Sequence, residues 1–299
     1  MKFTRTLLAC CALAAVVITY GFSVERYALR INTYPLYFEN LPDEFDGYTI
    51  LMFSDLHYGL FMSEPWVRHV IAMTNNAGAD LVVGLGDYVH RRRFTGELTA
   101  VWPMLRTLKA KDGVYFVNGN HEHWADSALS LDLLERSGLS LRHRHTLLRR
   151  GGAALALAGC GDMRGGDEPG LEKALAGIPA GTFTIVLAHT PDTADLPHGN
   201  RVDLFLCGHT HGGQIIVPFL GKPILVPVDN RSYDFGLKRN ARHEAVFISR
   251  GIGWAILPVR LNCPPELAVV RLLKKGGRAA GLHGRDTMYT ENTPLSLRW

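Results

Sequence analysis

Paired cysteines are missing from this sequence. Cys10 and Cys11 lie together in an apolar N-terminal segment, and the rest of the chain has only Cys160, Cys207 and Cys263, with no CxxC spacing. Three scattered cysteines argue against a disulfide framework and against a cysteine-ligated zinc site. We therefore interpret these three as small, buried apolar residues.

A strong charge of either sign is missing as well. The 299 residues carry a formal net charge of +4, which is too small to indicate nucleic-acid binding, and no nucleic-acid-binding motif is visible. The chain also has no GxSxG nucleophile elbow, no fixed-period repeat and no low-complexity tract. With 47% hydrophobic and 20% charged residues, its composition is typical of a globular protein with a sizeable core.

One long uncharged run is present at the N-terminus. Residues 7–24, LLACCALAAVVITYGFSV, would span about 27 Å as a helix, which is just enough for a bilayer core. No small-x-small cleavage site follows, so we expect residues 1–24 to form an uncleaved signal anchor that crosses a membrane once. A cleaved signal peptide and a lipoprotein box at LLAC are the alternatives. Basic residues lie on both sides of the run and favour a cytoplasmic N-terminus only weakly, so the side of the membrane that holds the body stays open: Lys2, Arg5, Arg26 and Arg30.

Beyond this segment, short apolar runs alternate with amphipathic stretches. We expect strands at 48–55, 80–87 and 113–120, helices at 62–78, 97–110 and 127–138, and then a strand-rich half with strands at 153–159, 182–189, 202–208, 244–251 and 266–273. This alternation predicts an α/β fold in which helices cover the faces of a sheet. We interpret 25–47 as a linker or an edge segment, the basic stretch 142–150 as a solvated face, and 274–299 as a poorly packed tail.

Polar residues follow five of the expected strands at the point where each strand ends. In chain order they are DLH at 55–57, GD at 86–87, GNHE at 119–122, AH at 188–189 and GHTH at 208–211. Each piece alone is explained by a turn or a helix cap. Because ligands of open α/β sheets bind beyond the carboxyl ends of strands, the ordered set predicts one shared metal site with nitrogen and oxygen ligands.

These motifs, with SDLHYG, GNHEHW, AHTPD, VDLFLCGHTHGGQ and the later SRGIG…LPVR…PPEL, resemble the calcineurin-like metallophosphoesterase superfamily and, more narrowly, its bacterial membrane-anchored branch. The resemblance covers about residues 48–273 and implies one metallophosphoesterase domain with a four-layer α/β/β/α sandwich. It also implies two divalent metal ions of the Mn, Fe or Zn type. One ion would be held by Asp55, His57 and His211, the other by Asn120, His189 and His209, and Asp87 would bridge both.

The resemblance further implies a phosphoesterase in which a metal-bridging hydroxide attacks phosphorus. His121 would be the catalytic residue at the leaving oxygen. Protein phosphatases of the superfamily read GDxxDRG, and the second aspartate orients this histidine, whereas this chain reads GDYVHRRR with His90 at that position. His121 is therefore either a weaker general acid or oriented by another group. Glu122 is one candidate for that group, and the alternative is that Glu122 only caps the next segment. Arginines suit phosphate binding, so the candidate substrate-binding residues are His90, Arg91, Arg92 and Arg93.

A phosphodiester or diphosphate of a lipid-linked molecule is the substrate class that the branch resemblance favours. One activity of the branch is hydrolysis of UDP-2,3-diacylglucosamine in lipid A biosynthesis, and the apolar stretch 217–227 is either a wall for acyl chains or an edge strand with its partner. The expected partners are then a phosphorylated, acylated small molecule and membrane lipid, with no nucleic acid. That substrate is made in the cytoplasm, so a phosphodiesterase acting on extracytoplasmic cell-envelope phosphodiesters is the alternative. A non-catalytic scaffold is disfavoured because all seven ligand positions are filled.

Overall fold

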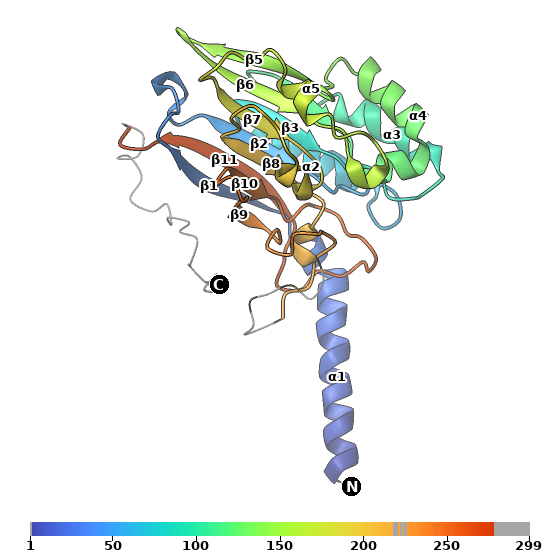
Figure 1. Ribbon diagram of the computed structural model, residues 1–299. Helices are drawn as coiled ribbons and strands as arrows, with labels where there is room; N and C mark the ends of the chain where they lie inside the picture. The colour runs from blue at the N-terminus through green and yellow to red at the C-terminus, as the bar shows by residue number, and fades with distance from the viewer. Residues whose placement is uncertain (1, 218–220, 222, 224–225, 278–299) are drawn as a thin grey trace.

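Two β-sheets face each other in the computed structural model of the chain, and helices cover their outer faces (Figure 1). The structure describes residues 2–217, 221, 223 and 226–277. The first sheet has the order β1-β11-β2-β3-β4, with strands Arg30–Phe38, Glu266–Lys274, Thr49–Phe53, Leu81–Leu85 and Val114–Val117. The second has the order β5-β6-β7-β8-β10-β9, with strands Arg144–Arg150, Ala153–Gly159, Phe183–Leu187, Leu204–Cys207, Ala245–Ile248 and Gly236–Arg239.

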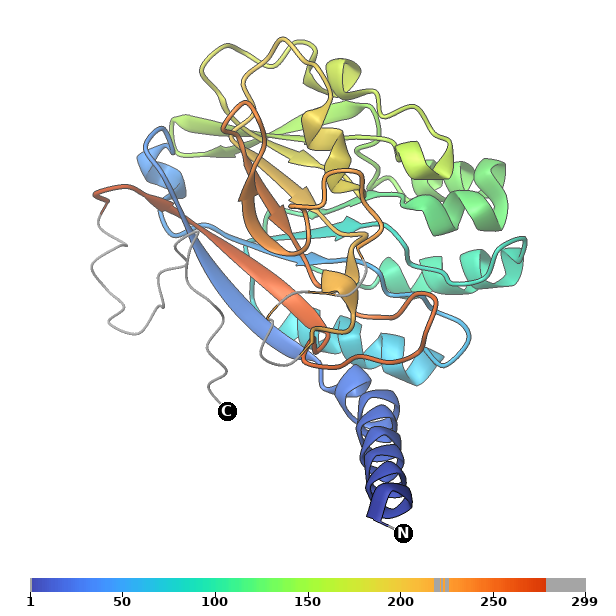
Figure 2. The same cartoon turned by 60° about the horizontal axis from the view of Figure 1, so that its bottom comes forward.

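The helices α2 (Glu64–Asn76), α3 (Thr95–Leu105), α4 (Asn120–Arg136) and α5 (Leu171–Leu175) form the two outer layers, and α1 (Lys2–Ser23) lies outside them. Apolar residues of α2, α3 and α4 share one buried cluster with the outer face of the first sheet, and α5 packs in another cluster on the second sheet. The α/β/β/α sandwich expected from the sequence is therefore confirmed. Figure 2 shows α1 projecting from the body as a separate rod.

Alternation within single strands builds the central core between the sheets. In β3, Leu81, Val83 and Leu85 point into this core, whereas Val82 points to the helices on the other face. Strands β7 and β8 contribute Ile185 and Leu206 from the facing sheet, and Tyr34 of β1 meets Phe247 of β10 with ring centroids 4.7 Å apart. A two-residue period with both faces buried fixes which side chains can emerge at the strand ends.

The linker interpretation of 25–47 is wrong for Arg30–Phe38, and the edge interpretation is right. These residues form β1, which pairs in parallel with the whole of β11 at the edge of the first sheet. The folded body therefore begins before residue 48. The basic stretch 142–150 is also more than a solvated face, because Arg144–Arg150 forms β5 and pairs antiparallel with β6.

The third expected helix begins earlier than its sequence pattern indicated. Helix α4 starts at Asn120 instead of 127, and the extended backbone of Asp126 (φ −169°, ψ 108°) divides it into a first turn and a longer segment. That first turn carries Asn120, His121 and Glu122, so these side chains lie on a helix N-terminus that follows β4 directly. Of the expected tail, residues 278–299 lie outside the described residues, as does most of 217–227.

Packing between the sheets gives a first test. Ile185 is fully buried in the central core, so Ile185→Ala removes apolar contacts and leaves a cavity, and we expect the free energy of unfolding to fall by about 2–5 kcal/mol. Ile31 on the edge strand β1 is 43% exposed, so Ile31→Ala is the matched control and should cost less than about 1 kcal/mol. Chemical denaturation of the full chain in detergent measures both. Equal losses for the two variants would contradict this account of the core.

Candidate metal centre

Five parallel strands bring the candidate ligands to one end of the sandwich. Asp55 and His57 follow β2, Asp87 follows β3 and Asn120 follows β4, three neighbouring strands of the first sheet. His189 follows β7, and His209 and His211 follow β8, two neighbouring strands of the second sheet. The two sets meet because the sheets pack face to face with these strand ends on the same side. His209, for example, donates its backbone N–H to both carboxylate oxygens of Asp55 at 3.1 and 3.2 Å.

The backbone of this end is unusually strained. Five of the seven candidate ligands have a positive φ: Asp55 (55°), His57 (49°), Asp87 (54°), His209 (69°) and His211 (54°). Only a few per cent of non-glycine residues adopt this conformation, and each instance costs about 1–3 kcal/mol. Glycine permits the close approach between these turns, because a Cβ on Gly119 would lie 2.4 Å from Asp87 Oδ1. Such concentrated strain is typical of a functional site.

Four side chains form the first group of possible ligands: Asp55, His57, Asp87 and His211. His57 Nε2 lies 3.1 Å from His211 Nε2 and 3.7 Å from Asp87 Oδ2. His211 Nε2 also lies 3.2 Å from Asp55 Oδ1. Two imidazole nitrogens and two carboxylates therefore face one point in a fully buried pocket, which suits a divalent cation with mixed nitrogen and oxygen ligands.

A second group, Asp87, His189 and His209, lies next to the first. Asp87 Oδ2 is 3.3 Å from His189 Nε2, and His189 Nε2 is 3.1 Å from His209 Nδ1. The outer ring nitrogens of both histidines bond to backbone carbonyls, His189 Nδ1 to Leu85 at 2.7 Å and His209 Nε2 to Pro227 at 3.0 Å. These carbonyls hold a proton on each outer nitrogen, so the inner nitrogens present their lone pairs to each other and need a cation between them.

Asp87 is the residue that both groups share. Burial by itself would raise its pKa, but the adjacent His189 ring and the other surrounding imidazoles hold the pKa of Asp87 well below its usual range. Conversely, burial opposes charge on His189, but the Asp87 carboxylate raises the pKa of His189 well above its usual value. Without a metal ion the pair thus holds a proton between Asp87 Oδ2 and His189 Nε2, and a metal ion competes for the place of that proton.

The other histidines are kept in the neutral form that binds metals. Burial lowers the pKa of His57 and of His211 well below the usual value, and burial together with His189 lowers the pKa of His209 to about 4. Burial raises the pKa of Asp55 to about 6, so its carboxylate is ionised at neutral pH. Neutral imidazoles with ionised carboxylates are the protonation states that a metal site requires.

Asn120 supplies an open ligand atom at the end of β4. The residue is buried, and its Oδ1 has no hydrogen-bond partner among the described residues. A buried amide oxygen without a partner is costly, so its position calls for a ligand. The nitrogen and oxygen donors present therefore fit two divalent ions, with Asp87 between them.

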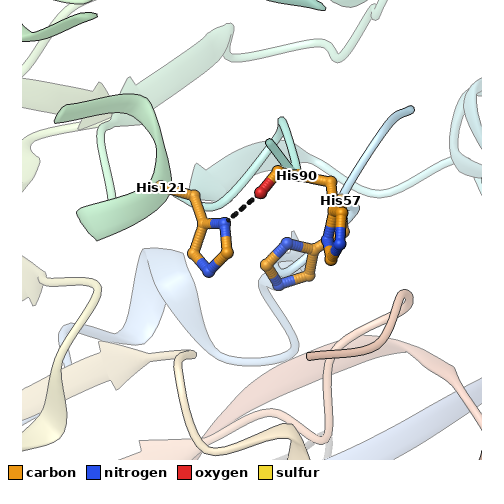
Figure 3. A group of neighbouring side chains, drawn as sticks. All are labelled: His57, His90 and His121. Atoms are coloured by element: carbon orange, nitrogen blue, oxygen red, sulfur yellow. Dashed lines mark hydrogen bonds between the residues drawn. The ribbon is translucent and has the colours of Figure 1, made fainter. Parts of the chain in front are cut away.

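His121 lies beside the first group, and Figure 3 shows how its ring is held. Its Nδ1 donates to the backbone carbonyl of His90 at 2.7 Å, and its Nε2 faces Asp87 Oδ2 at 4.0 Å. The His121 ring centroid is 4.4 Å from that of His57. The orienting partner of His121 is thus a main-chain oxygen. Any residue at position 90 has such an oxygen, so this hydrogen bond does not depend on the side chain there.

Glu122 does not orient His121, so that alternative is wrong, and the capping alternative is confirmed because Glu122 caps the start of α4. Its carboxylate is fully buried and accepts four backbone N–H groups at 2.7–3.1 Å, from Asp87, Tyr88, Val89 and Gly119. These bonds join the turn after β3 to the turn after β4. Glu122 therefore fixes the strained backbone of Asp87 and acts on the metal centre through that residue.

The candidate substrate-binding residues lie beside the cluster with partners of their own. Arg91 Nε pairs with Glu97 Oε1 at 2.6 Å, and its guanidinium lies over the Phe94 ring at 3.7 Å. Arg92 covers the Trp124 ring, also at 3.7 Å, and the Arg93 backbone N–H bonds to the Trp124 carbonyl. The His90 ring packs against Trp254, with centroids 4.4 Å apart.

Sequence reasoning missed two residues that border this site. Trp254 packs on His90 from the loop after β10, and Arg260, which is completely buried, donates to the carbonyls of Gly253, Cys263 and Arg250. Arg260 Nη1 also reaches the His211 carbonyl at 3.5 Å. Both belong to the SRGIG…LPVR stretch. The charge of Arg260 in an otherwise apolar run was a signal in the sequence for its position, and Trp254 had no such signal.

Residues 48–213 of this chain match the family model described as calcineurin-like phosphoesterase. The chain belongs to this family. Its members are metal-dependent phosphohydrolases that use two divalent ions, and the strand-end cluster of Asp and His residues provides the side chains to bind them. The enzyme class and the metal requirement expected from the sequence are thus confirmed.

Several relatives resemble this family member over most of its length. The metallophosphoesterase YkuE of Bacillus subtilis is 32% identical over 270 residues, which are 87% of this chain and 93% of YkuE. The phosphodiesterase YaeI of Escherichia coli is 31% identical over 76% of this chain and 82% of YaeI. A zebrafish (Danio rerio) protein named transmembrane protein with metallophosphoesterase domain is 28% identical over 91% of this chain and 63% of its own length.

The four bonds to Glu122 give the second test. In Glu122→Gln an amide NH₂ would face backbone N–H donors, so we expect the free energy of unfolding to fall by about 1–3 kcal/mol and the bound metal to fall with it. Glu64→Gln is the matched control, because Glu64 lies on the surface of α2 and pairs only with Arg68 among the contacts described for it. Denaturation and elemental analysis of the purified chain measure the two quantities. Metal content and stability equal to those of Glu64→Gln would refute the role assigned to Glu122.

Proposed function

We propose that this family member is a membrane-anchored, dinuclear metal phosphodiesterase or pyrophosphatase acting on a lipid-linked phosphate, such as UDP-2,3-diacylglucosamine. The observation that carries the proposal is the convergence of six buried Asp and His side chains from four strand ends of two sheets, with the unpartnered Oδ1 of the buried Asn120 at a fifth strand end. Asp87, which faces histidines of both groups, makes this one two-ion centre instead of two separate sites.

In this proposal Asp55, His57 and His211 would hold one ion, Asn120, His189 and His209 would hold the other, and Asp87 would contribute to both. Bound ions would neutralise charge on the phosphoryl group and lower the pKa of water, so that a nucleophile would be available at neutral pH. The chain's own residues fix this arrangement, because the carbonyls of Leu85 and Pro227 orient two of the ligand rings.

His121 is the proposed catalytic residue at the leaving oxygen. Its Nδ1–H is bound to the His90 carbonyl, which leaves Nε2 to face the centre from its partly exposed side. A proton on Nε2 can then be given to the oxygen that departs from phosphorus. The His90 carbonyl prevents the ring from turning away, so His90 is a positioning residue through its backbone.

The lipid-linked substrate rests on the N-terminal helix. Residues Phe3–Tyr27, which cover most of α1 and the 3₁₀ turn that follows it, form a span with a mean hydropathy of 2.2, long and apolar enough to cross a membrane. A relative is named as a transmembrane protein with the same domain. We propose that α1 anchors the enzyme in the membrane and that its substrate is drawn from that membrane.

The third test addresses the metal centre and the substrate together. In the intact protein in detergent, Asp87→Asn removes the bridging charge, so we expect a loss of about 10³-fold in kcat on bis-p-nitrophenyl phosphate and less than one ion per chain. Asp132→Asn, at an exposed position on α4, is the control. Wild-type hydrolysis of UDP-2,3-diacylglucosamine supports the lipid substrate, whereas soluble diester activity without it points to the cell-envelope alternative. No hydrolysis of either substrate by metal-loaded wild type would overturn the enzyme assignment.

The fourth test concerns His121. If His121 protonates the leaving oxygen, His121→Ala should lower kcat by about 10²–10⁴-fold for a diester with an alkyl leaving group but much less for p-nitrophenolate, which leaves without a proton. Metal content should stay at the wild-type level. His69→Ala, on the exposed face of α2, is the matched control. An equal loss for both leaving groups would assign His121 to binding instead of proton transfer.

A further inference from the structure

The loops beside the metal centre carry apolar side chains that the body of the protein does not cover. Leu60 is 52% exposed and Phe61 45% in the loop after β2, and Ile256 is 78% and Leu257 56% in the loop after β10. We call these four residues the apolar rim. Their loops, 58–62 and 254–259, contain no charged residue. Exposed apolar residues gathered in this way indicate a surface that has a partner.

The backbone of the rim makes the exposure more unusual. Ile256 has a φ of 62° and Phe61 a φ of 66°. A β-branched side chain in the left-handed region is a clear outlier. A solvent-exposed position with this backbone conformation usually holds glycine or asparagine. Exposure and strain occur together at Ile256, so packing within the described part of the protein does not account for an isoleucine at this position.

Both loops are joined to the last turns of α1. Phe61 packs on Phe22 with ring centroids 5.8 Å apart, and its carbonyl accepts from Tyr27 Oη at 3.0 Å. Arg260 N–H donates to the Gly21 carbonyl at 3.2 Å, so the second loop also lies against the helix. Figures 1 and 2 show α1 projecting from beneath the body. The rim is thus held at the level of residues 21–27, where α1 ends and joins the body.

That level is where a membrane surface would lie. The 22 residues of α1, Lys2–Ser23, extend about 33 Å, slightly more than a bilayer core of about 30 Å, so the last turn of α1 and the 3₁₀ turn after it, Glu25–Tyr27, reach the interface. Tyr27 and Trp66 pack together there with ring centroids 5.3 Å apart, and aromatic residues of this kind favour the interfacial region.

The same loops border the accessible side of the metal centre. Among the clustered histidines, His90 and His121 are partly exposed, whereas the candidate ligands are buried. Trp254 packs on His90 at 4.4 Å and on Phe61 at 5.8 Å between ring centroids, so it connects the opening of the centre to the rim. His57 and Phe61 also belong to one loop.

We propose that the apolar rim inserts into the bilayer interface beside α1 and seats the opening of the metal centre at the level of the lipid head groups. This rests on the proposed membrane anchor and deepens the proposed function, because a phosphate on a membrane lipid reaches the centre past Trp254 without leaving the bilayer. The partner of the surface is the lipid bilayer, and a second copy of the chain is the competing occupant.

A fluorescence experiment tests the rim independently of any substrate. The full chain with Cys10→Ser and Cys11→Ser receives Ile256→Cys, is labelled with an environment-sensitive fluorophore and is reconstituted in nanodiscs. We expect blue-shifted emission that spin-labelled lipids quench. Gly152→Cys is the control, because this exposed turn between β5 and β6 lies at the end of the body away from α1 and a Cβ there meets no atom within 4 Å (Figure 1). Emission as in Gly152→Cys, or a blue shift without lipid quenching, would overturn the proposal, the latter in favour of a protein partner.

A substitution then links the rim to turnover. Ile256→Asp with Leu257→Asp should lower the ratio of lipid to soluble diester turnover at least about tenfold, because a loss near 1.4 kcal/mol of interfacial contact gives that factor. The swap Ile256→Leu with Leu257→Ile keeps the apolar surface and should keep the ratio. An unchanged ratio in the aspartate variant would overturn the link. If wild type hydrolyses no lipid phosphate, the substrate proposal fails, and lipid quenching at Ile256 still decides whether the rim meets the bilayer.

Discussion

Contact between the two sheets is the constraint on which the rest of this structure depends. Neither sheet carries a complete set of metal-binding side chains, since Asp55, Asp87 and Asn120 emerge from one and His189, His209 and His211 from the other. The central core holds the strand ends at a fixed offset, so that His57 and His211 face each other at 3.1 Å. The ligand geometry of a metal centre built across two sheets therefore depends on how the sheets pack, and bound ions would in turn stabilise that packing.

Strain and desolvation at this end are balanced by a few well-satisfied polar groups. The left-handed turns at Asp55, Asp87 and His209 aim carboxylates and imidazoles at one point but cost conformational free energy. Glu122 offsets part of this cost with four backbone hydrogen bonds, and Arg260 does the same for the turns on the other side through backbone carbonyls. The centre thus depends on buried groups that never approach the substrate.

The sequence was informative where chemistry and periodicity coincide. Strand ends with Asp, Asn or His in a fixed order identified the site, because buried strands leave few positions at which such side chains can emerge. Strand β1 was ambiguous because an edge strand is apolar on one face only and contains Pro35, which an edge tolerates. Strand β5 was hidden by its arginines, which an edge strand also tolerates. The partner of His121 was out of reach for a different reason, since a backbone carbonyl leaves no residue type to recognise.

The connection between α1 and the first sheet is very short. After α1 come Val24, a single 3₁₀ turn, Glu25–Tyr27, and two residues before β1, which pairs along its whole length with β11. The connection is therefore too short to let the body move far from the end of α1. With α1 in a bilayer, the enzyme can diffuse within the membrane plane and rotate about the membrane normal, but it can hardly move along that normal. The metal centre would therefore stay at one distance from the bilayer and would not reach a phosphate held farther out.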